Sequence, residues 1–362
     1  PLAVRVDGGS ASASEIMAST LQEYGRALIV GTRTAGALAG ALLFPLPEGA
    51  GLEVAVEEVR TGRGGVLVDG QGVTPDIVVA DERTPADYAA GRDPQLAAAV
   101  AALVRGWAPD FIVTTGDNNY PRGEAATIDG NIGPYYHGFI APYRGRYGPG
   151  ADRNRFFPAL GNHDWESPGA RPFRDYFTLP GNERYYDVRW GPVHLFILDS
   201  DPREPDGITA DSRQARWLRE RLQASDAPWR LVVLHHPPYS SGLHGSTPAL
   251  QWPFARWGAH AVLAGHDHSY ERIERDGIVY FVNGLGGHPA RYPFRTPVPG
   301  SQVRYWARHG ALWVEADATT LVFRFITVDG KEIDRRVLTQ AARNARALPP
   351  GGDFVDEPPP LR

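Results

Sequence analysis

Four short polar motifs constrain the fold of this chain more than any other feature of its sequence. They are Gly116-Asp117-Asn118-Asn119-Tyr120, Gly161-Asn162-His163-Asp164, His235-His236-Pro237-Pro238 and Gly265-His266-Asp267-His268. Most of them directly follow an apolar run that predicts a buried strand. Because the carboxyl ends of neighbouring parallel strands meet at one edge of a sheet, we expect these side chains to gather there. The motifs therefore predict an α/β sandwich with metal-ligating residues along one sheet edge.

Composition narrows the class of protein without identifying it. The chain has 362 residues, is 42% hydrophobic and carries a formal net charge of −5, so it can form two or more domains and lacks the basic field that nucleic-acid binding needs. It contains no cysteine, which excludes disulfides, thiolate metal sites and cysteine nucleophiles. No apolar run reaches the roughly 18–20 residues of a membrane span. The sequence enters a strand-like run directly after Pro1, from which we expect an upstream part to be missing.

Turn signals and hydrophobic periodicity predict four parts. Residues 1–80 are expected to form a compact α/β piece, 81–94 a polar linker, 95–340 the main α/β domain and 341–362 a loose tail. Inside the first part, residues 52–59 and 66–68 are predicted to be paired strands.

Two further signals belong to the main domain. Asp93 before Pro94 predicts the start of a helix. Val328-Asp329-Gly330-Lys331 predicts a hairpin turn in an antiparallel end of the domain.

The donor types in the motifs predict a site for two metal ions. A carboxylate at a strand end can bridge two cations, and amide oxygens and imidazole nitrogens complete such sites. A phenol has a pKa near ~10 and ligates well only as phenolate, which requires a strongly acidic cation such as ferric iron. Two cations about 3.5–4 Å apart suit phosphate ester hydrolysis, because they stabilise both the attacking and the leaving oxygen. The candidate metal ligands are Asp117, Tyr120, Asn162, His235, His266 and His268.

Other polar residues in the motifs are given different roles. His163 stands beside a ligand and is better placed to donate a proton to the leaving group than to bind metal. His236 is expected to be a neighbour of the site, and Asp164 and Asp267 to be structural. His244 lies in a Gly-Leu-His-Gly loop, where contact with phosphate and simple exposure are both open.

From Gly116 to Arg272 the motifs resemble those of the calcineurin-like metallophosphoesterases, and especially the purple acid phosphatase branch. The resemblance covers about residues 95–340 and includes Val232-Val233-Leu234-His235 and Tyr270-Glu271-Arg272. It implies a four-layer αββα sandwich. It also implies that Asp117 bridges the metals, that Tyr120 and His268 bind the first, and that Asn162, His235 and His266 bind the second.

The resemblance also implies an activity and a location. The metals would be iron with zinc, manganese or a second iron. The reaction would be hydrolysis of small phosphomonoesters by metal-bound hydroxide, and the protein would be periplasmic or extracellular. Nucleic acid and membrane are not expected partners, and the oligomeric state is left open.

One family motif is missing. The family begins with a strand that ends in an aspartate ligand of the first metal, and no such motif precedes Asp117. Asp81 is a candidate substitute, because it closes the apolar run 76–80 and stands one crossover length before Asp117. In the alternative, the first metal has lost a ligand, the sheet has lost a strand, and activity is impaired or absent.

Residues 1–80 resemble a different family, the tail-specific (C-terminal processing) serine proteases. Ser12, in the small-residue turn from Gly9 to Glu15, matches their nucleophile, and the segment 70–79 is similar to the end of their catalytic region. A nucleophilic serine needs a base. The family uses a lysine in a Gly-Lys turn, but here Gly36 is followed by Ala37, and Lys331 is the only lysine of the chain. We therefore expect an inactive fragment fused to the phosphoesterase-like part, with a peptidase using Ser12 as the weaker alternative.

Overall fold

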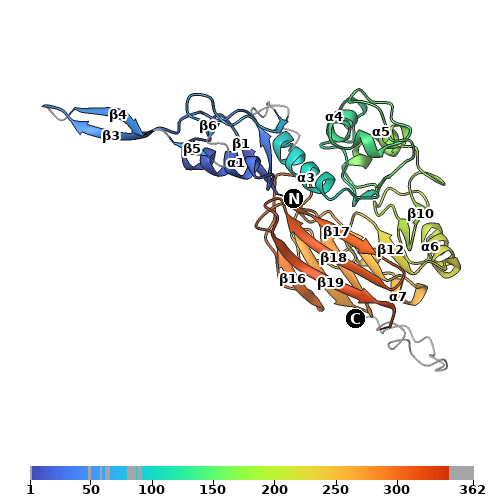
Figure 1. Ribbon diagram of the computed structural model, residues 1–362. Coiled ribbons are helices and arrows are strands. Elements are labelled where there is room, and N and C mark those ends of the chain that lie inside the picture. Colours follow the sequence, from blue (N-terminus) through green and yellow to red (C-terminus); the bar gives the residue numbers. More distant parts are fainter. Residues whose placement is uncertain are drawn as a thin grey trace.

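The computed structural model describes residues 2–47, 50–57, 59–61, 66–79, 87 and 92–341. Asp81 and nearly all of the expected tail, residues 342–362, lie outside these ranges. Figure 1 shows a small N-terminal lobe with a projecting hairpin, followed by a larger lobe built from strands with helices on its outer side. No helix in the described part of the chain is long and apolar enough to cross a membrane.

The elements follow the predicted order closely. The helices are α1 (Ala13–Glu23), α3 (Pro94–Gly106), α4 (Ala125–Tyr136), α5 (Arg171–Tyr176), α6 (Arg213–Ala224) and α7 (Phe254–Trp257). The strands of the N-terminal lobe are β1 (Ala3–Val6), β2 (Leu28–Gly31), β3 (Gly40–Pro45), β4 (Gly51–Glu57), β5 (Arg60–Thr61), β6 (Val66–Leu67) and β7 (Ile77–Val78). The later strands are β8 (Ile112–Thr114), β9 (Phe156–Pro158), β10 (Tyr186–Trp190), β11 (Val193–Ile197), β12 (Trp229–Val233), β13 (Ala261–Ala264), β14 (Tyr270–Arg275), β15 (Ile278–Asn283), β16 (Ser301–Tyr305), β17 (Gly310–Ala316), β18 (Thr320–Thr327) and β19 (Glu332–Thr339).

A seven-stranded sheet forms the centre of the larger lobe, with the order β10-β11-β12-β13-β15-β14-β16. Strands β11, β12, β13 and β15 are parallel, so their carboxyl ends lie at one edge. These strands are buried on both faces, as expected for parallel strands covered on each side. One face, with Phe196 and Val232, packs against α6 and α7 through Leu218 and Phe254.

The other face of this sheet packs against a second layer of strands. Its Leu195 and Leu231 share a core with Ile112 of β8, Phe156 of β9 and Phe323 of β18. Helix α4 adds Ile128 and Ile132 to the same core, and α3 contacts β17. The architecture is therefore the predicted four-layer αββα sandwich, with α6 and α7 on one outside and α3 and α4 on the other (Figure 1).

The second strand layer consists of two separate pieces. Strand β8 pairs in parallel with β9, and β17, β18 and β19 form an antiparallel sheet closed by the predicted hairpin at 328–331. No ladder among the described strands joins β8 to β17.

The N-terminal lobe is a parallel sheet of order β1-β2-β7. Helix α3, capped as predicted by the Asp93 carboxylate accepting from the Leu96 N–H, packs Ala98, Ala99 and Ala102 against this sheet. Strand β7, which precedes Asp81, therefore pairs with β2 and not with β8. This pairing gives no support to Asp81 as the end of a replacement strand beside β8.

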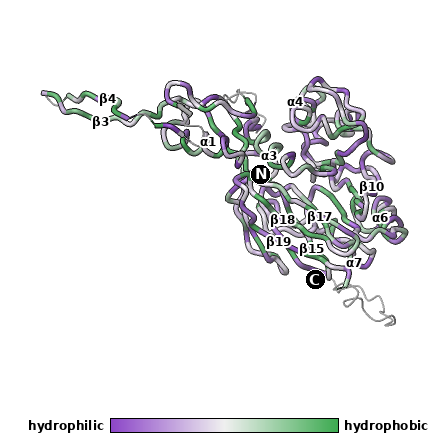
Figure 2. Tube along the Cα trace, viewed as in Figure 1, coloured by the Kyte–Doolittle hydropathy of each residue, from purple (hydrophilic) through white to green (hydrophobic). Residues whose placement is uncertain are grey.

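The predicted pairing of residues 52–59 with 66–68 is wrong. Strand β4 pairs with β3, and β6 pairs with β5. The short apolar run that forms β3 lies just before β4 in the sequence, so the two strands can form a hairpin. β4 therefore pairs with β3 and not with β6. Figure 1 shows this hairpin projecting from the lobe, and Figure 2 shows apolar residues along it.

Candidate metal centre

Asp117 follows Gly116 in the loop after β8. Its backbone has a conformation that residues other than glycine rarely adopt. Its φ is 55°, and Gly116 before it has a φ of 94°. A Cβ on Gly116 would lie 2.5 Å from His235 Nδ1, and a Cβ on Gly161 would lie 2.2 Å from Asp117 Oδ1. The two motif glycines are therefore needed for close approach of the loops. His266 is also strained, with a φ of 66°, and such strain persists where the surrounding structure enforces it.

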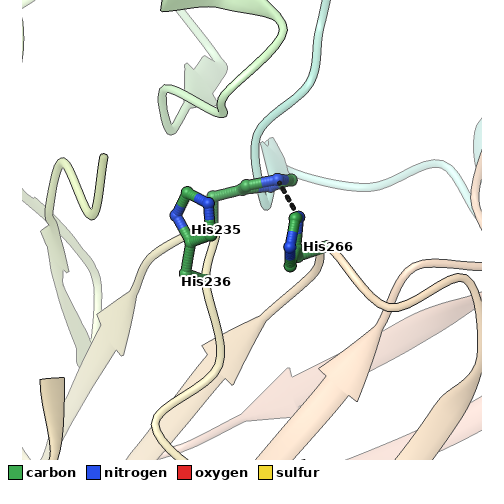
Figure 3. A group of neighbouring side chains, drawn as sticks. All are labelled: His235, His236 and His266. Atoms are coloured by element: carbon green, nitrogen blue, oxygen red, sulfur yellow. Dashed lines mark hydrogen bonds between the residues drawn. The ribbon is translucent and has the colours of Figure 1, made fainter. Parts of the chain in front are cut away.

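His235 is held in one orientation by the backbone. Its Nδ1 lies 2.7 Å from the Thr115 carbonyl oxygen, which can only accept, so Nδ1 carries the proton that is donated there. Its Nε2 then faces Asn162 Oδ1 at 3.0 Å, His266 Nδ1 at 3.1 Å and Asp117 Oδ2 at 3.2 Å. Figure 3 shows His235 and His266 pointing toward each other from neighbouring strand ends.

These four atoms are mutually repulsive unless something positive lies between them. A carboxylate oxygen, an amide oxygen and two unprotonated imidazole nitrogens are all acceptors. A proton on His235 or a bound cation meets this need. The donor set of Asp117, Asn162, His235 and His266 thus fits a divalent cation of the kind that imidazole and carboxylate bind.

A second group of donors shares Asp117. The Tyr120 hydroxyl donates to Asp117 Oδ2 at 3.0 Å and lies 3.4 Å from His268 Nε2. His268 donates its Nδ1 proton to the Ala290 carbonyl, 3.0 Å away, which leaves Nε2 free on the Tyr120 side. The structure therefore brings all six predicted metal ligands together, but this second group offers only three of them.

Burial and charge set the protonation states of the site. Burial raises the pKa of Asp117, but the charge and hydrogen bond of His235 more than reverse this and hold it below its usual value. Burial lowers the pKa of His266 to about 2, helped by the charges of His235, His236 and His244. Burial and the charge of His288 lower the pKa of His268 to about 4. Neutral imidazoles are the form that binds metal.

Tyr120 and Asp164 shift in the opposite direction. Burial and the Asp117 charge raise the pKa of Tyr120, so the phenol is neutral without a strong cation. Burial and the Asp117 charge raise the pKa of Asp164 to about 6. Asp164 accepts from the N–H groups of Gly161 and Asn118 and so braces the two loops, a structural place that agrees with its prediction.

His163 lies beside the site. Its backbone N–H donates to Asp117 Oδ1 at 2.9 Å, and its Nδ1 donates to the Pro121 carbonyl at 2.6 Å. Its ring lies 4.3 Å from that of Tyr120. With Nδ1 committed to the backbone, Nε2 is the nitrogen that can carry a proton to a substrate.

His244 and His236 flank His266. Their ring centroids lie 4.4 Å and 4.5 Å from that of His266. The His244 N–H donates to Asp267, which also accepts from Ser240, so Asp267 has the structural position predicted for it.

Distance alone places His236 in a group with His235 and His266 whose nitrogens lie within 4.8 Å of one another (Figure 3). Its Nδ1, however, lies 3.0 Å from Ser200 Oγ, whereas His235 is oriented toward Asp117. His236 therefore has one ring nitrogen engaged outside the group around Asp117.

Two residues at the site were missed from the sequence. The ring of His288 lies 4.5 Å from His268 and 4.8 Å from Tyr120, and Tyr292 stacks on His268 at 4.7 Å. Both lie in the loop after β15 and belong to no motif, and no sequence signal separated His288 from the other histidines.

Ser12 occupies a strained turn at the start of α1, with a φ of 56°. Its N–H donates to the Ala37 carbonyl at 3.0 Å and to Glu15 Oε2 at 3.1 Å. Buried Glu15 also accepts from the N–H groups of Gly36 and Ala37, which fastens this second loop to the turn. Position 37 is therefore next to Ser12, as the resemblance implies, but it carries a methyl group instead of a base.

Comparison with known proteins follows the same division. Residues 1–79 match the model of peptidase family S41, and the chain is 41% identical over 88 residues to a carboxy-terminal-processing protease of Bartonella bacilliformis, covering 24% of this chain and 20% of that protein. It is 24% identical over 301 residues to tartrate-resistant acid phosphatase type 5 of Homo sapiens, covering 71% of this chain and 88% of that protein.

The fold comparison agrees with the sequence comparison. A purple acid phosphatase from yellow lupin (Lupinus luteus) superposes with a TM-score of 0.57 at 18% identity, covering 73% of this chain and 53% of that chain. The model of the calcineurin-like phosphoesterases matches residues 72–270, which is more than half of the sequence. The chain therefore belongs to the calcineurin-like phosphoesterase family, with an S41 peptidase segment at its amino-terminal end.

Proposed function

We propose that this protein hydrolyses small phosphomonoesters at the Asp117 centre, using two bound cations. One observation carries the proposal. Three acceptor atoms, on Asp117, Asn162 and His266, lie 3.0–3.2 Å from a fourth acceptor, His235 Nε2, and each of the four residues lies on a different loop. Such an arrangement costs free energy unless a cation or proton is bound, and a fold has no structural reason to build it.

The residues divide into two sets around the shared carboxylate. Asp117, Asn162, His235 and His266 would hold one cation. Asp117, Tyr120 and His268 would hold the other. Iron would bind to the Tyr120 phenolate, and zinc, manganese or a second iron would bind to the set that contains His235. When bound, the cations lower the pKa of water and neutralise charge on the phosphate oxygens.

The protein's own side chains would bind and orient the ester. His163, held through Nδ1 by the Pro121 carbonyl, would carry on Nε2 the proton that the leaving alkoxide takes up. The His244 ring lies 4.4 Å from that of His266 and would contact a phosphate oxygen. The set around Tyr120 has three donors, one fewer than the set around His235, and this difference supports reduced activity.

Metal stoichiometry and phosphatase activity test the proposal together. The purified chain is supplied with iron, manganese and zinc, the bound metal is counted by mass spectrometry, and p-nitrophenyl phosphate hydrolysis is assayed. We expect metal-dependent turnover that Asp117→Asn abolishes, while Asp226→Asn, an exposed carboxylate, leaves it unchanged. Retained turnover in the Asp117→Asn variant would exclude this centre as the active site.

The second candidate function is a remnant without catalysis. The short donor set at Tyr120 favours it, and it predicts fewer than two metals per chain and no hydrolysis of any phosphate ester. An absorption band in the visible region from iron on Tyr120 would argue against it. Location outside the cytoplasm is part of the proposal and is tested by fractionation of the native host.

A further inference from the structure

A large space, partly open to solvent, lies between the two pieces of the second strand layer. Its volume is about 1080 Å³, and it is lined by β8, β17, α3, α4 and the inner face of the seven-stranded sheet. The lining is mainly apolar along its length, with Val104, Val113, Leu231, Phe281 and Leu312 among its walls. Native cores contain few voids larger than a water molecule, so a space of this size is unusual between packed layers.

The edge of β8 facing this space has unused backbone groups. The Ile112 N–H donates to Arg155 O at 2.8 Å, and Thr114 O accepts from the Ala159 N–H at 3.0 Å. Both groups point toward β9. Because alternate residues of a strand direct their backbone groups to opposite sides, Val113 directs its N–H and C=O toward the space, where no described residue pairs with them.

The edge of β17 is open in the same way. His309 O accepts from the Val328 N–H at 3.0 Å, and the Asp317 N–H donates to Thr320 O at 2.9 Å. The backbone N–H and C=O groups of the odd-numbered residues of β17 therefore point toward β18. Leu312 and Val314 therefore direct their backbone groups away from β18. Within the described residues these groups have no hydrogen-bond partner. Two open strand edges thus border one space.

Two orphaned side-chain atoms also line the space. Trp107 Nε1 and Asn283 Oδ1 are buried without a hydrogen-bond partner, and both residues belong to its walls. Trp107 follows α3 and stacks on Trp313 of β17, whereas Asn283 ends β15 at the metal-centre edge. A buried unpaired donor or acceptor costs about 1–3 kcal/mol, so both atoms favour an occupant with polar groups.

The residues at the metal-centre end of the space indicate which charged group an occupant would carry there. This end is lined by Asp117 together with His235, His266, His268 and His288. One carboxylate faces four imidazoles there, and this end becomes positively charged when the proposed cations are bound. An occupant carrying a carboxylate at this end would be electrostatically complementary to those cations.

We propose that the space between β8 and β17 binds an extended peptide strand of about five residues, apolar on both faces, with a carboxylate near Asp117. Only a peptide backbone satisfies two strand edges at once, which a compact apolar molecule cannot do. A strand parallel to β8 would place its carboxyl end at the metal centre, because β8 itself leads into Asp117. The strand-binding part rests on the fold alone, and only the role of the carboxylate rests on the proposed function.

The binding test uses the metal-free full chain and a labelled peptide, acetyl-Lys-Val-Ile-Val-Ile-Ala-Asp-amide. We expect saturable binding by fluorescence anisotropy and a raised melting temperature. The control peptide has proline at two alternate positions, which removes the ladder donors, and we expect it to bind at least tenfold more weakly. Equal binding of both peptides, or binding of neither, would overturn the proposal.

A protein variant tests the location. Ala97→Phe on α3 directs an aromatic ring into the space, so it should raise the melting temperature by itself and abolish peptide binding. Met17→Phe, at an exposed position of α1, is the matched control and should change neither. Undiminished binding to the Ala97→Phe variant would place the peptide elsewhere and refute the assignment.

The carboxylate is tested by metal stoichiometry. The Asp peptide should raise the number of iron and zinc ions bound per chain, whereas the same peptide ending in Asn should bind without doing so. Equal stoichiometry with both peptides would refute the carboxylate while leaving strand binding intact. Failure of peptide binding leaves the Asp117→Asn phosphatase test unaffected, so the two proposals fail separately.

Discussion

His235 donates its Nδ1 proton to the carbonyl oxygen of Thr115 at 2.7 Å, across the junction between the seven-stranded sheet and β8. This bond fixes the ring so that Nε2 points at Asp117 Oδ2, 3.2 Å away. His268 makes the equivalent bond to the Ala290 carbonyl. Partners of this kind set the tautomer and orientation of metal-binding histidines. The backbone therefore fixes the orientation of both rings.

Adjacent histidines at the end of β12 should behave differently when replaced. His235→Ala removes the nitrogen around which the acceptors converge. We therefore expect the set of Asp117, Asn162 and His266 to lose its metal and phosphatase activity to fall roughly 100-fold or more. His236→Ala should cost no more than about tenfold, because His236 Nδ1 is engaged with Ser200. Metal counting and turnover on both variants check this, and equal losses would place His236 among the ligands.

Gly116 should tolerate alanine poorly. The positive φ by itself costs an alanine about 1–2 kcal/mol, and the clash of the new Cβ with His235 adds about 1–3 kcal/mol. The matched control is Gly169→Ala, where φ is also positive at 65° but nothing lies within 4 Å of the new Cβ. Urea unfolding of both variants measures the difference. A free energy of unfolding equal in the two would mean that the loop moves away without cost.

Much of the main domain was predictable because its signals are local. The helix that begins at Pro94 has Asp93 as its N-cap, three residues before Leu96, whose N–H donates to the Asp93 side chain. The strands before Asp117 and His266 are short apolar runs that end near a glycine. The pairing of β4 was wrong because the choice between two nearby partners depends on loop closure, which periodicity does not contain. The division between β8 and β17 could be suspected only from the missing motif.

The site was predictable for the same reason, and its limits have a physical cause. The candidate ligands inside motifs follow strand ends, so the topology brings Asp117 and His266 together. His288 and Tyr292 reach the site through the path of a long loop, which leaves no periodic signal in the sequence. The orientation of His235 depends on the Thr115 carbonyl, a backbone group that no residue type reveals.

Ser12 should be unreactive as it stands and gain reactivity from a single substitution. Its turn is strained and its helix N-terminus offers amide donors, but the neighbouring position 37 lacks a base. Ala37 is exposed and its carbonyl accepts from the Ser12 N–H, so Ala37→Lys places an amine within reach of the serine. We expect no labelling of the unmodified chain by a fluorophosphonate probe and measurable labelling of the Ala37→Lys variant.

The control for this prediction is the double variant Ser12→Ala with Ala37→Lys, which should lose the label. Labelling of the unmodified chain at Ser12 would show that a base other than residue 37 serves the serine, and would revive the peptidase interpretation.

Stability at acid pH should depend on Asp187. Its carboxylate lies 2.7 Å from His194 Nε2 and 2.8 Å from Arg221 Nη2. Burial raises the pKa of Asp187, but the hydrogen bonds from His194 and Arg221 outweigh it and lower the pKa below the usual value. Because the folded-state pKa lies below the unfolded value of about 3.9, this stabilisation is complete above that pH and is lost as the pH falls through the folded-state pKa.

Asp187→Asn removes this contribution. The free energy of unfolding should therefore differ between the parent and Asp187→Asn by a constant amount above about pH 5 and by a shrinking amount below about pH 4. Denaturant unfolding between these limits and pH 2 measures it. Asp226→Asn is the matched control, since its ion pair with Arg189 is largely exposed and contributes little. A gap that stays constant down to pH 2 would mean that Asp187 has the same pKa in the folded and unfolded chain.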